Sequence, residues 1–334
     1  MRSLLLLPLL ALLAACGRPT GVVLYCALDE SFAAPIVREF EQRTGLHVDA
    51  YYDVEADKSV GLRRRLQAEA GRPICDVFWN NEPVQSAVLA EGGLLVPYRS
   101  PAGADVPARW RDPQDRWCGF AARARVIIVN TQLRPDAARR PAGLADFLDP
   151  ANADQAAMAA PLTGTTAAQA AAWLARLGQD GALARFAALQ ANKVHFGPGN
   201  AHVMRLVREG QLAFGWTDTD DCLEALESGY PVAMVIPDQG PQDEGLLVIP
   251  NTVGLVAGAP HPDAARQLID FLLSRDVEAR LAAGSSAQIP LRPDVPRPEK
   301  VLDLSRYRLA EVDWTAAGAA WAKAAPALEA AFNH

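Results

Sequence analysis

Short apolar runs alternate with amphipathic segments from residue 22 onward. Val22–Cys26 is an apolar run of the kind found in buried parallel strands. In the segment that follows, Phe32, Ile36 and Phe40 fall on one helical face, and Gly45 stands where a helix C-cap is expected. The pattern predicts strands at 22–26, 46–52 and 76–79, and helices at 32–44, 58–70 and 83–91. Strands and helices that alternate across short loops indicate a parallel α/β sheet.

A second α/β unit is expected after Gly119 and Phe120. Strands are predicted at 126–130 and 212–216, an extended segment at 246–257, and helices at 166–189, 203–208, 262–273 and 314–321. No repeat and no low-complexity linker separates the two units. We therefore expect two lobes joined by strands, with a hinge that lets the lobes close on a ligand.

The residues before position 22 have the organisation of an export signal. Arg2 is positively charged, and the apolar run 4–13 is too short to span a bilayer, which takes about 20 apolar residues. The run ends in Leu13-Ala14-Ala15-Cys16, which resembles a bacterial lipobox, so we expect cleavage before Cys16 and lipidation of its thiol. An ordinary buried apolar helix is the alternative. The chain is thus expected to be exported and lipid-anchored to a membrane, at its periplasmic face or at the cell surface.

The pattern as a whole predicts a division of the chain. The expected parts are a signal peptide at 1–15, the lipidated cysteine and a tether at 16–21, a first lobe at 22–122 and 248–285, and a second lobe at 123–247 and 286–334.

Composition excludes several functions. Half of the residues are hydrophobic and the net charge is −7, with acids and bases interspersed, so we expect no nucleic-acid partner. The sequence contains no GxSxG, HExxH, GxxxxGK[ST] or GxGxxG motif, so we expect neither an enzyme nor a required cofactor. Four cysteines follow Cys16 without CxxC spacing, and the sequence leaves open whether they form disulfides or stay free; they are Cys26, Cys75, Cys118 and Cys222.

Acidic and amide side chains follow the predicted strands. Ligands of open α/β sheets bind beyond the carboxyl ends of the strands, so these positions are candidate ligand contacts. They are Asp29 after the first strand, Asp53 and Glu55 after the second, Asn81 and Glu82 after the third, and Asp218, Asp220 and Asp221 after 212–216. Some are expected to be helix N-caps instead, Glu82 and Asp221 first among them.

The three acids Asp218, Asp220 and Asp221 stand within four residues of one another. Packed in a cleft, they raise one another's pKa values unless a cation or an arginine lies among them. Oxygen ligands suit hard cations, and the metal ligands predicted on this basis are Asp29, Glu82, Asp220 and Asp221.

Three further groups offer hydrogen-bond donors. Arg123 and Arg125 alternate along a strand end and so point to one face, from which they either neutralise the acids or hold an anion. Thr165 and Thr166 belong to a Thr163–Thr166 corner at a helix start, and Asn200 precedes another helix. Both helix starts are simple caps in the alternative interpretation. His202, beside Asn200, is the one histidine retained as a candidate.

Taken in order, these segments resemble the iron(III)-type solute-binding proteins of ABC importers, a branch of the type II periplasmic-binding fold. The resemblance covers about residues 22–293. It is carried by Val23–Gly45, Ala68–Pro97, Gly119–Arg125, Gly210–Asp221 and Pro250–Val256. It implies two α/β lobes joined by hinge strands, a ligand cleft between them, and delivery of the ligand to an ABC permease with its ATPase. We expect a monomer.

The chain departs from the family's pattern at the ligand. Iron-binding members typically use two adjacent tyrosines where this chain has Asp220 and Asp221. A histidine is often found where this chain has Asp29, and a glutamate where it has Asn81, whereas the arginines and Asn200 match. The resemblance therefore does not name the ligand.

Two ligand classes follow from the residues. The first is a cation, either a metal ion, iron included, or an organic amine, held in an acid-rich cleft between the lobes. The alternative is a phosphorylated or carboxylated metabolite held by Arg123, Arg125 and Thr163–Thr166. A hydrolase or lyase on the same scaffold is a remote alternative, because no nucleophile and base can be named.

Overall fold

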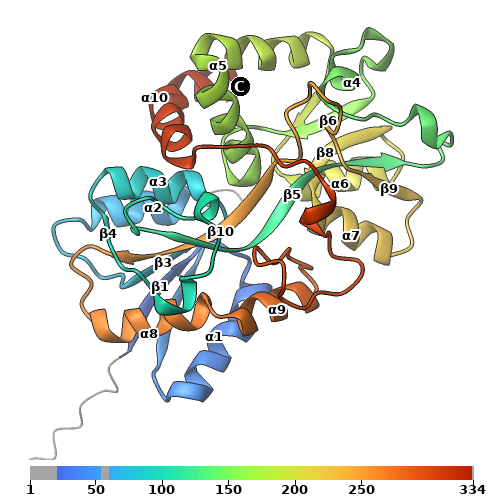
Figure 1. The fold of residues 1–334 in the computed structure, drawn as a ribbon. Coiled ribbons are helices and arrows are strands. Elements are labelled where there is room, and N and C mark those ends of the chain that lie inside the picture. Colours follow the sequence, from blue (N-terminus) through green and yellow to red (C-terminus); the bar gives the residue numbers. More distant parts are fainter. Residues whose placement is uncertain (1–20, 54–59, 333–334) are drawn as a thin grey trace, which may run out of the picture.

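The computed structural model describes residues 21–53 and 60–332, which form two α/β lobes (Figure 1). Within these residues the strands form one ten-stranded sheet in the order β2-β1-β3-β10-β5-β8-β6-β7, with β4 added beside β10 and β9 beside β5. The predicted α/β class and the two-lobed arrangement are confirmed. The export signal, Cys16 and Glu55 lie outside the described residues.

The first lobe is built on parallel strands at the N-terminal end of the chain. Its strands are β1 (Val22–Cys26), β2 (Val48–Tyr52), β3 (Val77–Asn80) and β4 (Leu95–Val96), and its helices are α1 (Glu30–Thr44), α2 (Val60–Ala68), α3 (Pro83–Glu91), α8 (Pro262–Leu272) and α9 (Arg275–Ala283). β1 pairs in parallel with β2 and β3. α1 buries Ile36 and Phe40 as predicted, and Gly45 ends it in the left-handed conformation, with φ 73°.

The second lobe repeats the strand–helix alternation. Its strands are β6 (Ala156–Ala159), β7 (His195–Gly197), β8 (Phe214–Asp218) and β9 (Val232–Val235), and its helices are α4 (Leu144–Leu148), α5 (Gly164–Ala191), α6 (Asn200–Arg208) and α7 (Thr219–Glu227). α5 was expected to be continuous. It is kinked at Gly178, whose φ of 71° and ψ of 172° lie outside the helical region.

Two antiparallel strands, β5 (Cys118–Asn130) and β10 (Val248–Val256), connect the lobes. The first half of β5 pairs with β10 in the first lobe, and its second half, from Arg125 onward, pairs with β8 and β9 in the second lobe. The strand predicted at 126–130 was therefore too short. β5 is buried almost throughout, and its first half is rich in alanine. The sequence did not predict this half because alanine lacks the strong strand preference of the Val and Ile residues that follow.

The last helix, α10 (Trp314–Phe332), packs against α3 of the first lobe and α5 of the second (Figure 1). A hydrophobic cluster accordingly runs from Phe78 through Trp321 to Trp173, across both lobes. The segment that was assigned to the second lobe thus contacts both, and the lobe boundaries remain predictions.

Two further findings bear on the sequence analysis. Cys26, Cys75, Cys118 and Cys222 are free thiols rather than disulfides. Among the described residues, no helix has the length and hydropathy needed to cross a membrane.

Candidate functional site

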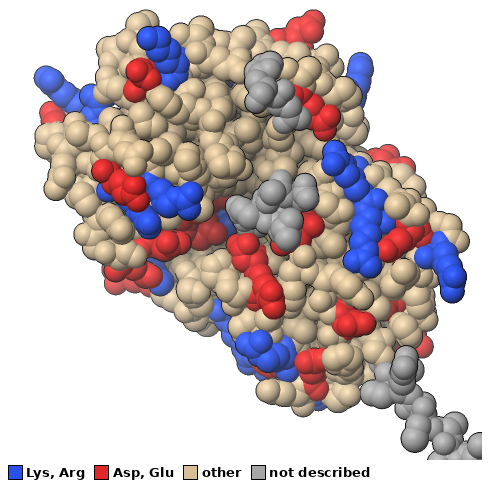
Figure 2. Space-filling view, turned by 180° about the vertical axis from the view of Figure 1, so that it is seen from behind, with Lys and Arg blue, Asp and Glu red and all other residues tan. Residues whose placement is uncertain are grey.

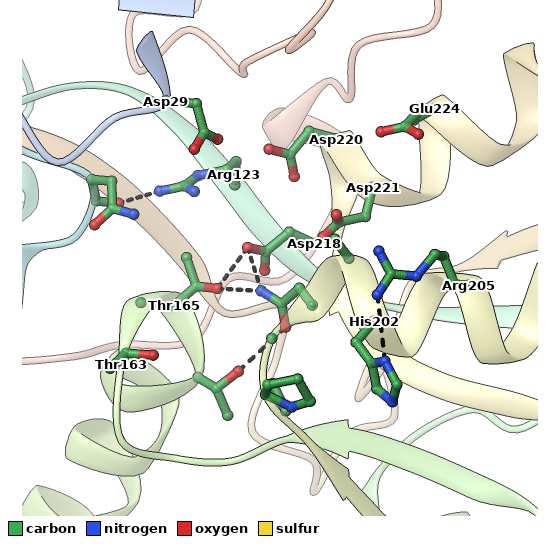
Figure 3. Close-up of a pocket in the computed structure, with 18 of the residues that line it drawn as sticks. Asp29, Arg123, Thr163, Thr165, His202, Arg205, Asp218, Asp220, Asp221 and Glu224 are labelled. Atoms are coloured by element: carbon green, nitrogen blue, oxygen red, sulfur yellow. Dashed lines mark hydrogen bonds between the residues drawn. The ribbon is translucent and has the colours of Figure 1, made fainter. Parts of the chain in front are cut away.

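A cavity of about 820 Å³ lies where loops from both lobes meet (Figures 2 and 3). The first lobe contributes Asp29, Phe32 and Asn81, and the crossing strand β5 contributes Arg123. The second lobe contributes the starts of three helices. The residues concerned are Thr163–Thr166, Pro198–His202, Arg205, Asp218, Asp220, Asp221, Glu224, Glu227 and Ser228; Ser285 follows α9. The loops beyond β1, β3, β6, β7 and β8 meet here because the carboxyl ends of parallel strands share one edge of a sheet.

Three helices of the second lobe begin at this cavity. The N-cap residues of α5, α6 and α7 are Thr163, Gly199 and Asp218. Neither the Thr163 nor the Asp218 side chain caps the helix that it precedes, and Gly199 has no side chain. The first amides of a helix have no partner within the helix, and the helix dipole is positive at that end. The second lobe therefore offers the cavity a wall that attracts negative charge.

One carboxylate already occupies part of this wall. The Asp218 side chain accepts hydrogen bonds from Arg125 Nη1 at 2.8 Å, Thr165 Oγ1 at 2.6 Å and Asn200 Nδ2 at 3.0 Å. Arg125 also donates to Asn200 Oδ1 at 2.9 Å and to Gln169 Oε1 at 3.0 Å. We call Arg125, Thr165, Asn200 and Asp218 the Asp218 corner. Arg125 is fully buried and does not line the cavity, whereas its partners Thr165, Asn200 and Asp218 do.

Arg123 differs from Arg125 in that it forms no ion pair within the described part of the chain. It is 5% exposed, and its Nη2 donates to the backbone oxygen of Asn81. Its Nε has no hydrogen-bond partner, and no carboxylate of the described residues lies within ion-pair distance of its guanidinium. Arg123 therefore presents to the cavity a guanidinium that forms no ion pair among the described residues, although its charge partly offsets the raised pKa of the buried Glu82 carboxyl. Figure 3 shows it in the same space as the carboxylates of Asp29 and Asp220.

The three acids at the start of α7 lie together, with one oxygen from each of Asp218, Asp220 and Asp221 within 4.8 Å of the others. Asp221 accepts a hydrogen bond from Thr217 Oγ1 at 2.8 Å. Burial, followed by the charges of Asp220 and Asp218, raises the pKa of Asp221 well above its ordinary value. This cluster is the part of the site with the donor set that a hard cation requires.

Glu82 is placed differently from the expectation. Its carboxylate accepts from the backbone amides of Val84 at 2.6 Å and Gln85 at 3.1 Å, and from Asn80 Nδ2 at 2.8 Å, so it caps α3. Burial raises the pKa of Glu82 to about 7. Its side chain is fully buried and does not line the cavity, whereas its neighbour Asn81 does. Glu82 therefore has the capping role that was named as its alternative from the sequence, and its binding of the ligand or a metal stays a prediction. Asp53 likewise accepts from the amide of Leu62 at 3.1 Å and lies away from the cavity.

Comparison with known proteins places the chain in a family. Residues 74–312 match the family model described as bacterial extracellular solute-binding protein. The chain belongs to this family. A Salmonella typhi periplasmic protein named for 2-aminoethylphosphonate binding is 27% identical over 233 residues, which cover 69% of this chain and 66% of that relative. An Fe(3+)-binding periplasmic protein of Serratia marcescens is 25% identical over 265 residues, or 78% of this chain and 76% of that relative.

Solved structures agree with the fold of this solute-binding protein. Iron-bound HitA from Pseudomonas aeruginosa superposes with a TM-score of 0.82 at 22% identity, covering 94% of this chain and 99% of HitA. AfuA from Actinobacillus pleuropneumoniae, solved with fructose-6-phosphate, gives 0.79 at 22% identity, covering 93% and 98%. The resemblance to the iron(III)-type branch of the type II fold is confirmed. The family consists of solute-binding transport proteins and not of enzymes.

Several lining residues of this solute-binding protein were not predicted. Glu224 follows Asp220 and Asp221 at helical spacing on α7, a signal that the sequence did contain. Arg205 lies one turn after Ala201 on α6 in the same way. Phe32 was expected on the apolar face of its helix and also lines the cavity. Ser285 had no signal in the sequence, because it reaches the cavity from a loop after α9 that no strand precedes.

Proposed function

We propose that the chain is the extracytoplasmic receptor of an ABC importer, lipid-anchored through Cys16, and that it binds a small amine-bearing solute between its lobes. The observation that carries this proposal is the charge of the cavity. Among the described residues, Asp218, Asp220 and Asp221 each place one oxygen within 4.8 Å of the others at the cavity, and Asp29 lines it from the first lobe. Three of the lining acids already have basic partners: Asp218 pairs with Arg125, Glu224 with Arg208 and Glu227 with Lys300. A cationic group relieves the mutual repulsion of such carboxylates.

The best match in chemistry is a solute that carries both charges. Arg123 is a buried cation without a carboxylate partner among the described residues, so it suits the acidic end of a ligand. Asp29 and Asp220 suit an ammonium group in the space beside it (Figure 3). The relative named for 2-aminoethylphosphonate binding supports this class, because that molecule joins an ammonium to a phosphonate through two carbons.

A hard metal ion is the second candidate, favoured by the oxygens of Asp218, Asp220 and Asp221 within 4.8 Å of one another. Asp29, from the other lobe, is the further acid that would complete such a site on closure. The relative named for Fe(3+) binding supports this candidate, whereas the resemblance stated from the sequence implies a tyrosine pair where this chain has Asp220 and Asp221.

Calorimetry with matched compounds distinguishes these ligands. The probes are 2-aminoethylphosphonate, ethanolamine, which lacks the phosphonate, ethylphosphonate, which lacks the amine, and ferric citrate. We expect 2-aminoethylphosphonate to bind most tightly and to stabilise the fold by ~2.7 kcal/mol at a hundredfold excess over its Kd. Ethylphosphonate should bind much more weakly. Equal affinity for both phosphonates would show that the acids do not recognise an amine, and binding of ferric citrate alone would favour the metal.

Uptake measurements test the transport role. A strain that lacks the gene should take up the bound solute more slowly, and the intact gene should restore the rate. A variant with Arg123 replaced by glutamine, which retains the fold but not the proposed ligand contact, should fail to restore it. Unchanged uptake without the gene would contradict the receptor role.

A further inference from the structure

Donors from three separate elements converge on the Asp218 carboxylate. Arg125 comes from β5, Thr165 from the first turn of α5, and Asn200 from the first residue of α6. All of their hydrogen bonds to Asp218 are between 2.6 and 3.0 Å long. Arg125, Thr165 and Asp218 are each no more than 2% exposed. The corner is therefore a built, desolvated binding site for an oxyanion.

The chain itself supplies that oxyanion. Asp218 is the N-cap residue of α7, where an aspartate ordinarily accepts from the first amides of its own helix. Here its side chain makes no such cap and turns instead into the corner between α5 and α6. The same set of a guanidinium, a hydroxyl, an amide and two helix starts would hold a phosphate or carboxylate of a free ligand.

We propose that Asp218 is a specificity-determining residue, whose carboxylate occupies the anion position of the corner and so excludes phosphate, phosphonate and carboxylate groups from it. An incoming oxyanion would meet donors that are already bonded and a like charge in contact. The acidic end of a solute is thereby directed to Arg123, and its positive end to the remaining acids. The anionic ligand predicted at Arg125 and Thr163–Thr166 would have to displace Asp218. This inference rests on the proposed function in that the solute binds in this cavity.

Substitution of Asp218 tests the inference with inorganic phosphate as the probe. Asp218→Ser removes the carboxylate, leaves space for an anion and retains a residue that can cap α7. Asp220→Asn is the matched control, because it removes the same charge from the same cavity outside the corner. Calorimetry should show at least about a tenfold gain in phosphate affinity for Asp218→Ser over the wild type. Asp220→Asn should show no comparable gain.

Adding Thr165→Val to Asp218→Ser should abolish the gain, because it removes a donor of the corner. An equal gain in Asp220→Asn would show that only the net charge matters and would overturn the inference. So would a folded Asp218→Ser variant without any gain, or wild-type protein that binds phosphate as tightly as the variant does.

Folding is monitored separately, since Asp218→Ser leaves Arg125 buried without its counterion. We expect a lower Tm for this variant in chloride, and recovery in phosphate at equal ionic strength. If Asp218→Ser does not fold, Asp218→Gly, which leaves the same space and which a helix N-cap also tolerates, carries the same test. A phosphate-independent Tm in the variant that folds counts against the inference.

The two proposals fail separately. If the wild type binds neither an amine nor a metal ion, the proposed ligand class fails, yet a phosphate gain in Asp218→Ser still supports the role of Asp218. If the wild type binds 2-aminoethylphosphonate and Asp218→Ser gains no affinity for phosphate, the ligand class stands and the role of Asp218 fails.

Discussion

The Arg123 guanidinium donates a hydrogen bond to the backbone oxygen of Asn81, and this bond ties the crossing strand β5 to the loop after β3. It holds the arginine at the cavity without neutralising it, because a carbonyl oxygen carries no full charge. Asp218, by contrast, neutralises Arg125. Arg123 and Arg125, separated by one residue on the same strand, thus have different surroundings: Arg125 pairs with a carboxylate of the protein, and Arg123 is the one that we propose contacts the ligand.

Replacement of Arg123 by glutamine should weaken solute binding by at least about tenfold, because the acidic end of the solute loses its charged partner. Stability should fall modestly, because the nearby charge of Arg123 favours the ionised form of the buried Glu82 carboxyl. Calorimetry and thermal unfolding measure the two effects. Arg205→Gln, further along α6 on the same cavity, is the control and should retain more of the affinity. Unchanged affinity in Arg123→Gln would remove Arg123 from the site.

Glu82 should make stability depend on pH. Burial raises its pKa from 4.5 to about 7 in the folded protein, so between these values the native state keeps a proton that the unfolded state releases. Stability is therefore expected to fall as pH rises through this range, by at most ~3 kcal/mol at about 1.4 kcal/mol per pKa unit. Urea unfolding of wild type and Glu82→Gln at about pH 5 and pH 7.5 measures this difference. The variant should show a smaller loss, and an identical loss in both proteins would refute the assignment.

Gly318 should be intolerant of a side chain. A Cβ atom at this position would lie 2.7 Å from Cβ of Ala87 in α3, so α10 would have to move away. Gly318→Val is expected to destabilise the protein by about 1–3 kcal/mol, as overpacked contacts do. Ala319→Val, exposed on the same helix, is the control and should cost less. Equal unfolding midpoints in urea for the two variants would contradict the prediction, because they would show that α10 can move away from α3 without a loss of stability.

Cys16 should determine where the protein is found. Cys16→Ser removes the proposed acylation site, so the protein should move from the membrane fraction to the soluble fraction and lose radiolabelled palmitate. Cys118→Ser removes a described thiol that forms no disulfide and should leave the distribution unchanged. Membrane attachment of the Cys16 variant would contradict lipid anchoring.

Most of the fold was predictable because local patterns and tertiary packing agree. Leu24 and Val77 lie in apolar runs that are indeed buried strands, and Gly45 ends α1 where the sequence places it. The predicted range of β5 was too short because the first half of the strand contains alanines and arginines rather than an apolar run. This half is buried through its pairing with β10, a strand that is distant in the sequence. Such non-local pairing leaves no periodic signal.

The location of the site was predicted better than the role of each residue in it. Strand ends supply Asp29, Asn81 and the acids of α7, as the geometry of parallel sheets requires. Whether Asn81 or Glu82 faces the cavity depends on a single residue of register, which fixes the direction of each side chain and which composition does not encode. That Asp218 is bonded to Arg125 depends on where β5 and β8 pair, and this is known only from the fold.

The contact of α10 with both α3 and α5 constrains how the molecule moves. α10 contributes no residue to the lining of the cavity, so it joins the two lobes outside the candidate ligand contacts. If the lobes move about this connection, the loops that carry Asp29 and Asp220 on opposite sides of the cavity are displaced relative to each other. We therefore expect a bound solute to change the distance between these two acids rather than the contacts of α10.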